Sequence, residues 1–178
     1  MTTPRQFAQA LLVGLGMPVT DNNVQALVAA QHLEGGFMHN ACLYNPLNTS
    51  QPMPGSRLVV RLTPTFGPQA YVNWEQGLAA TIKTITNGHY APILAKLAAS
   101  APPDETLQTW DVSPWGWWDP KSGKTNPVGS SAGYQMEADM PFPAGGGSLP
   151  PPSSGGGAAA VCLALLGVGY AFWRGWLG

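Results

Sequence analysis

Few acidic side chains in the first hundred residues could donate or accept a proton. Only Asp21, Glu34 and Glu75 precede residue 104. Asp21 is placed to cap a predicted helix, and Glu75 falls in the first turn of another, where a carboxylate meets the positive end of the dipole. Glu34 falls in the last turn of a predicted helix, where the dipole repels it. We expect a raised pKa for Glu34, which suits a general acid; an exposed Glu at a frayed helix end is the alternative.

A run of neutral polar residues follows Glu34. It comprises His39, Asn40, Tyr44, Asn45, Asn48, Thr49, Ser50 and Gln51. Such groups suit an uncharged sugar, because amides and hydroxyls bond its polar substituents while aromatic rings stack on its apolar faces. Asparagines beside a proline also cap turns, and the two roles are compatible. A carboxylic acid with a raised pKa is what glycoside cleavage needs to protonate the leaving oxygen.

The spacing of histidines and cysteines does not indicate a metal site. His32 and His39 lie seven positions apart across a helix end, which is no recognised zinc spacing, and His89 is remote. Cys42 and Cys162 are too far apart to suggest a disulfide framework. No Gly-rich loop follows a strand to open a helix, so we expect neither a metal nor a cofactor.

Two helices are predicted to position Glu34. Thr3 caps the first, which has Pro4 at its first position and ends at Gly16. The second begins at Asp21, taken as its N-cap, and ends at Gly35-Gly36.

A proline-rich loop and two further helices follow. Residues 37–72 contain five prolines, which predicts a loop with at most short strands around Leu58–Leu62. A third helix begins at Asn73, with Gln76 as capping-box partner. A short fourth helix carries Ile93 and Leu97 inward. Residues 1–101 are therefore predicted to form one small helical domain.

The composition changes after this domain. Residues 102–154 are rich in Pro and Gly and show little periodicity, which predicts an irregular connector. Residues 110–118 hold four tryptophans, which we expect to pack against the domain or a partner rather than to bind carbohydrate.

Residues 155–178 are predicted to be a single transmembrane anchor. Nineteen residues from Gly155 to Trp173 carry no charge, and as a helix they would span roughly 28 Å of a ~30 Å hydrocarbon core. Tyr170, Trp173 and Trp176 resemble an aromatic belt, so residues 155–177 are the expected lipid-contacting segment. No signal peptide is expected, because glutamines interrupt the apolar run near the N-terminus.

Four motifs in the first hundred residues carry a family resemblance. They are Leu33-Glu34-Gly35-Gly36, Asn45-Pro46-Leu47-Asn48-Thr49, Gln69-Ala70-Tyr71 and Trp74-Glu75-Gln76-Gly77-Leu78-Ala79-Ala80-Thr81. In this order they resemble the lysozyme-like, transglycosylase-like domains common in phages, over residues 5–98.

The resemblance implies roles for particular residues. Glu34 corresponds to the general acid and base, and Gly35 stands where the family has a Ser. Gln69 would line the cleft, and Tyr90, or else Tyr71, would lie near the catalytic carboxylate. The other residues expected to bind substrate are Asn45, Asn48 and Thr49.

The shortage of acids favours one reaction over its relatives. Glycoside hydrolases normally need a second carboxylate, whereas a lytic transglycosylase needs only one. With Asp21 and Glu75 assigned to helix starts, Glu34 alone predicts a transglycosylase that cleaves peptidoglycan. Goose-type hydrolysis, with Glu75 as the second carboxylate, is the close alternative.

These features predict a mainly α chain: a small lysozyme-like helical domain, an irregular linker and one C-terminal transmembrane helix. Of the 178 residues, 44% are hydrophobic and 10% are charged, and the net charge of −1 argues against nucleic-acid binding. The expected setting is the internal membrane of a phage virion, or otherwise a host membrane with the N-terminal domain toward the wall. A catalytically silent, membrane-anchored virion protein that contacts other virion proteins through residues 110–118 is the alternative.

Overall fold

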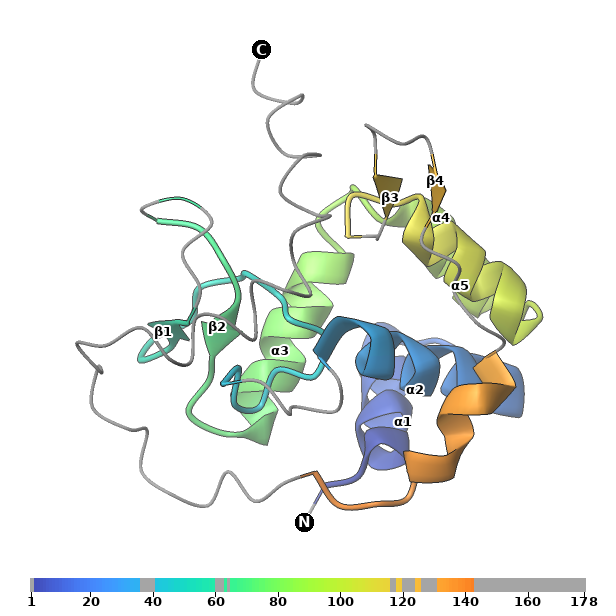
Figure 1. Ribbon diagram of the computed structural model, residues 1–178, viewed down its shortest axis with the longest axis horizontal. Coiled ribbons are helices and arrows are strands. Elements are labelled where there is room, and N and C mark those ends of the chain that lie inside the picture. Colours follow the sequence, from blue (N-terminus) through green and yellow to red (C-terminus); the bar gives the residue numbers. More distant parts are fainter. Residues whose placement is uncertain are drawn as a thin grey trace.

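A computed structural model of the chain describes residues 2–35, 41–59, 63, 65–115, 118–119, 124–125 and 131–142. This part of the protein is mainly helical, as predicted (Figure 1). Its helices are α1 (Pro4–Leu15), α2 (Asp21–Gly35), α3 (Trp74–Ile85), α4 (Ala91–Ala98), α5 (Pro103–Asp111) and the 3-10 helix η2 (Ser131–Glu137). Two antiparallel pairs join β1 (Arg57–Leu58) to β2 (Gln69–Ala70) and β3 (Trp118–Asp119) to β4 (Lys124–Thr125).

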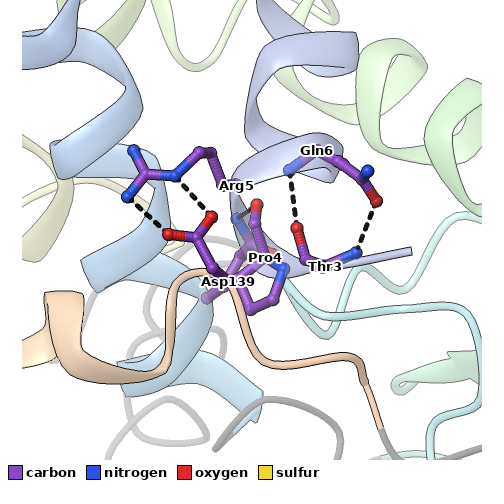
Figure 2. A network of polar contacts seen from close by, with 6 residues as sticks. Thr3, Pro4, Arg5, Gln6 and Asp139 are labelled. Carbon is purple, nitrogen blue, oxygen red and sulfur yellow. Dashed lines mark hydrogen bonds and ion pairs between the residues drawn. The ribbon is translucent and has the colours of Figure 1, made fainter. Parts of the chain in front are cut away.

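The first helix begins as its sequence predicts. The Thr3 hydroxyl accepts a hydrogen bond from the Gln6 amide at 3.2 Å, and the Gln6 side chain accepts one from the Thr3 amide at 3.0 Å (Figure 2). Pro4 occupies the first helical position, and Gly16 ends the helix with a left-handed φ of 67°.

The second helix starts at Asp21, as predicted, but its N-cap lies one residue earlier. Thr20, not Asp21, is the N-cap, because its hydroxyl accepts from the Asn23 amide at 3.4 Å. Asp21 is the first residue of α2 and still lies where a carboxylate meets the positive end of the helix dipole. Both residue types can cap a helix, so the sequence alone does not decide between them.

The third and fourth helices lie where they were predicted. Asn73 caps α3 by accepting from the Gln76 amide at 2.9 Å. The Gln76 side chain reaches the amide of Val72 at 3.2 Å, one residue before the position that a standard capping box uses.

The prediction of an irregular connector from residue 102 is wrong for its first part. Residues Pro103–Asp111 form α5, and its Leu107 and Trp110 are buried in the same core as α1 and α2. Ala138 and Phe142, near η2, belong to this core as well. The compact body therefore extends past residue 101 and includes the segment that ends at Phe142.

The second helix lies at the centre of this arrangement. α2 packs against α1, α5 and η2, while α3 packs on α1 and α4 packs on α5 (Figure 1). α2 consequently has few exposed positions along its second half, which includes Glu34.

The N-terminus is fastened to the segment that follows η2. Arg5 forms an ion pair with Asp139, with its Nε 2.7 Å from the carboxylate (Figure 2). The backbone adds two hydrogen bonds, from the Arg5 amide to the Ala138 carbonyl at 3.0 Å and from the Phe142 amide to the Thr2 carbonyl at 3.1 Å.

Among the described residues, no helix combines the length and the apolar character needed to cross a membrane. The anchor predicted at 155–178 lies outside these residues, as do positions 143–154 of the predicted connector.

Candidate active site

Glu34 lies in the last turn of α2 and is buried. The helix ends at Gly35, as predicted, and the Glu34 side chain is only 5% exposed. Its Oε1 atom is buried without a hydrogen-bond partner. The alternative of an exposed Glu at a frayed helix end is therefore wrong.

Burial raises the pKa of Glu34 well above its ordinary value, because the charged form loses its hydration. The direction agrees with the expectation, but burial rather than the helix dipole is the main cause. A favourable interaction between the Glu34 carboxylate and the Trp110 side chain lowers the pKa and so offsets part of this rise. The indole N–H nevertheless lies outside the geometry of a normal hydrogen bond, since Trp110 Nε1 is itself without a partner. Glu34 is thus a buried carboxyl group beside the Trp110 ring, with no hydrogen-bond partner for its Oε1 atom.

Tyr90 lies near enough to Glu34 for the two side chains to affect one another electrostatically. Burial raises the pKa of Tyr90 to about 12, and the negative charge of Glu34 adds to that rise. Tyr90 immediately precedes α4, which packs on α5. Of the two tyrosines that the resemblance suggested, Tyr90 and Tyr71, it is therefore Tyr90 that lies within electrostatic range of Glu34.

Asn48 fixes the backbone at the end of α2. Its side-chain amide donates a short hydrogen bond to the carbonyl of Glu34. Asn48 has a left-handed φ of 49°, a conformation that Asn tolerates better than most residues. The Asn45–Thr49 loop is thereby attached to the residue that carries the candidate acid.

The side chains of Asn45 and Thr49 form hydrogen bonds that hold this loop together and are not exposed to bind a ligand. The Asn45 side-chain amide donates to the carbonyls of Thr49 at 2.9 Å and Gln69 at 2.8 Å, and its Oδ1 accepts from the Thr49 amide at 2.9 Å. The Thr49 hydroxyl lies 2.5 Å from that of Thr84 on α3. Both residues are buried, so their polar atoms are used within the protein.

Gln69 and Tyr71 are also buried in this framework. Gln69 accepts from the Ser56 hydroxyl at 3.1 Å and donates to the Gly67 carbonyl at 3.2 Å. The Tyr71 hydroxyl donates to the Gln51 carbonyl at 2.8 Å, and burial raises its pKa. Of the predicted site residues, Asn48 and Tyr90 thus approach Glu34, whereas the other four form the hydrogen-bonded interior of the loop.

The tryptophan segment contributes two aromatic neighbours of this site. Trp110 is buried and Trp115 is partly buried, and their ring centroids lie 5.1 Å apart. The Trp115 ring also lies 5.2 Å from that of Tyr90, and its N–H donates to the Leu47 carbonyl at 2.9 Å. These two tryptophans pack against their own domain, as one of the predicted alternatives held.

The other acids are distributed differently. Asp21 and Glu75 are exposed in the first turns of α2 and α3. Asp111, which the sequence reasoning did not consider, is 2% exposed and directly follows Trp110. Its burial could be anticipated only once α5 was recognised as a helix that packs on α2.

Within the described ranges, no group of three His, Cys, Asp or Glu side chains is arranged to hold a metal ion. No protein-family model matches the chain, and neither a curated protein sequence nor a solved structure shows significant similarity to it.

Proposed function

We propose that this protein cleaves the glycan strands of peptidoglycan as a lytic transglycosylase, with Glu34 as its general acid and base. The observation that carries the proposal is the burial of Glu34 at the end of α2 beside Tyr90 and Trp110. A buried carboxyl group with a raised pKa keeps its proton to a higher pH than an exposed one, and the protonated state is the one needed to protonate a glycosidic oxygen.

The reaction proceeds in two proton transfers at one carboxyl group. Glu34 donates its proton to the glycosidic oxygen as the bond to the muramoyl anomeric carbon breaks. The resulting Glu34 carboxylate then accepts the proton of the muramoyl 6-hydroxyl, whose oxygen closes a 1,6-anhydro ring on that carbon. No water is consumed, and the enzyme returns to its starting protonation state.

Asp111 is a second buried acid, and an experiment must decide whether it takes part in a hydrolytic reaction. A hydrolase needs a second carboxylate as nucleophile or base. Glu75 is exposed in the first turn of α3, whereas Asp111 is buried in the helix that also carries Trp110. Asp111 therefore replaces Glu75 as the acid to test for a hydrolytic mechanism.

The proposed setting follows from the sequence outside the described residues. A C-terminal membrane helix at 155–178 would hold the domain close to a lipid surface, and the motif resemblance favours a phage virion protein that opens the host wall during genome entry. The internal membrane of a virion is the proposed location.

The test uses the full chain and purified peptidoglycan, with mass spectrometry of the products. We expect anhydro-ended muropeptides from the wild type and none from Glu34→Gln, which keeps the shape of the side chain. Asp111→Asn and Glu75→Gln are the matched controls and should retain product formation. Reducing-end products that disappear in Asp111→Asn would replace the transglycosylase with a hydrolase.

A structural role is the second candidate, favoured by the small exposed fraction of Glu34 and by the internal use of Asn45, Thr49, Gln69 and Tyr71. A silent, membrane-anchored virion protein would release no muropeptides from any wall type. The wild type and Glu34→Gln would then be indistinguishable in the same assay.

A further inference from the structure

Three aromatic side chains form a continuous wall beside Glu34. The wall consists of Tyr90, Trp110 and Trp115, with Trp115 between the other two. Its ring centroid lies 5.2 Å from that of Tyr90 and 5.1 Å from that of Trp110. Trp110 and Tyr90 are the two side chains whose interactions with Glu34 are described above. Trp115 thus contacts both aromatic residues that interact with the candidate acid, although 81 positions separate it from Glu34 in sequence.

The three rings differ in their access to solvent. Trp110 is 1% exposed and Tyr90 is 9% exposed, whereas Trp115 is only partly buried. The polar N–H of Trp115 is already used, because it donates to the Leu47 carbonyl at 2.9 Å. The indole ring of Trp115 is held in place by one hydrogen bond and two aromatic contacts, and ring carbons rather than the N–H are what it can offer a ligand.

We propose that Trp115 is the stacking platform for an N-acetylated sugar ring bound next to Glu34. Aromatic rings bind the apolar faces of pyranose sugars, and a ring fixed before binding loses little conformational entropy when the sugar arrives. This inference rests on the proposed function, since it assigns a substrate subsite to the same acid. It also gives the tryptophan segment a role in binding carbohydrate in addition to its packing role.

A neutral glycan is the ligand that this surface fits. The wall offers ring carbons, and Glu34 is held where its neutral form is favoured. A chain of β-1,4-linked N-acetylglucosamine presents the same apolar ring faces and acetamido groups as the peptidoglycan backbone. The tetramer, chitotetraose, is therefore the probe for this subsite.

The binding test follows the indole N–H resonances of the isotope-labelled full chain in detergent as chitotetraose is added. We expect the Trp115 resonance to shift with saturation, in the wild type and equally in Glu34→Gln. The Trp74 resonance should remain in place, because Trp74 packs instead with Phe7, Tyr44 and Phe142.

The kinetic test compares Trp115→Ala, Trp115→Phe and the matched control Trp74→Phe on peptidoglycan. Trp115→Ala should raise KM about tenfold, which is the upper range for one aromatic contact, with a smaller change in kcat. Trp115→Phe retains a ring and should recover most of the loss, and Trp74→Phe should leave KM unchanged. Thermal melts of each variant separate a binding defect from loss of the fold.

The outcomes distinguish this inference from the proposed function. Cleavage that depends on Glu34 but not on Trp115, with no Trp115 shift, overturns the platform and leaves the transglycosylase intact. A saturable Trp115 shift without any cleavage supports the subsite and overturns the enzyme. Absence of both the shift and the cleavage overturns both.

Discussion

The side-chain amide of Asn48 donates a hydrogen bond to the backbone carbonyl of Glu34, 14 residues earlier in the chain. The last carbonyls of a helix have no partner within the helix, so this bond satisfies one of them from outside. The second asparagine of the Asn-Pro-Leu-Asn-Thr motif is therefore a tertiary cap for the helix that carries the candidate acid. The side-chain amide of Asn48 thus bonds the protein backbone rather than a ligand.

Replacing Asn48 should destabilise the fold. Asn48→Ala removes the donor and places a less tolerant residue at a φ of 49°, so the free energy of unfolding should fall by about 2–3 kcal/mol. Asn48→Gly loses the donor but accepts the left-handed backbone, and its loss should be smaller. Urea unfolding of the two variants separates the hydrogen bond from the backbone term. Equal stability of Asn48→Gly and Asn48→Ala would show that the left-handed backbone at this position carries no cost.

Glu34 should make the protein less stable as the pH rises. Its pKa is higher in the folded state than its ordinary value of 4.5, so the folded state binds more protons than the unfolded state above that pH. The free energy of unfolding therefore decreases as the pH increases from about 4.5 toward the folded-state pKa, and then levels off. Glu34→Gln is always neutral and should lack this contribution.

Urea titrations of the wild type and Glu34→Gln between pH 4 and 8 measure the difference directly. The other carboxyl groups cancel in this comparison, including Asp139, whose pKa is lowered by its bond to Arg5. A wild-type stability that falls no faster with pH than that of Glu34→Gln contradicts the burial of an uncompensated carboxyl group.

Gly77 should tolerate no side chain. A Cβ atom at this position of α3 would lie 1.8 Å from the Tyr44 carbonyl oxygen, which belongs to backbone and cannot rotate away. Gly77→Ala must push the loop off α3, so we expect a loss of about 3 kcal/mol or more in thermal or urea unfolding.

Gly14→Ala is the control for the Gly77 variant. Its Cβ would meet the flexible end of Ile82 at 2.5 Å, and alanine favours the helix that Gly14 occupies. This substitution should change stability far less than Gly77→Ala. Similar losses in the two variants would argue against a close approach between the loop and α3.

The segment after residue 101 should be required for folding. A chain ending at residue 101 lacks Leu107, Trp110, Ala138 and Phe142, which are buried in the main core. We expect it to lose the sharp near-ultraviolet dichroism and cooperative melting that a chain of residues 1–142 retains. Cooperative melting of the 1–101 fragment would restore the predicted domain boundary.

Within that segment, the Phe142 side chain should contribute more to the free energy of unfolding than the ion pair between Arg5 and Asp139. Phe142 is 4% exposed and its ring stacks on Trp74 with 4.9 Å between centroids, so Phe142→Ala should cost about 3 kcal/mol. Arg5→Ala breaks the ion pair with Asp139, whose partners are 38% and 72% exposed, and should have a much smaller effect. Guanidinium denaturation of both variants tests the order.

The helices of the first hundred residues were predictable because their signals are local. Thr3 and Asn73 cap through backbone amides three residues ahead, and Gly16 supplies the left-handed end of α1. The start of α5 carried signals of the same kind, with Pro103 at the first position and two acids in the first turn. The surrounding prolines outweighed those signals in the prediction.

The surroundings of Glu34 were only partly predictable. Its position at a helix end follows from the chain order, but its burial depends on α5, which is remote in sequence. Trp110 reaches Glu34 across 76 positions, and no periodic pattern in a single segment indicates such a contact. Likewise, the polar residues of the loop were recognisable as hydrogen-bonding groups, but only the fold decides that Asn45 bonds backbone instead of a ligand.

The hydrogen bond between Thr2 and Phe142 has a mechanical consequence. Thr2 and Phe142, at the two ends of the described body, lie side by side. A force that pulls these two residues apart therefore does not shear the helices against one another. Such a force breaks the bond between Thr2 and Phe142 first and the ion pair between Arg5 and Asp139 next. Only then does it act on the packing of α1 against α2. The same proximity allows a short Gly-Ser bridge to join the two ends, so that a circularly permuted chain opened at the exposed Asn87-Gly88 turn could form the same body.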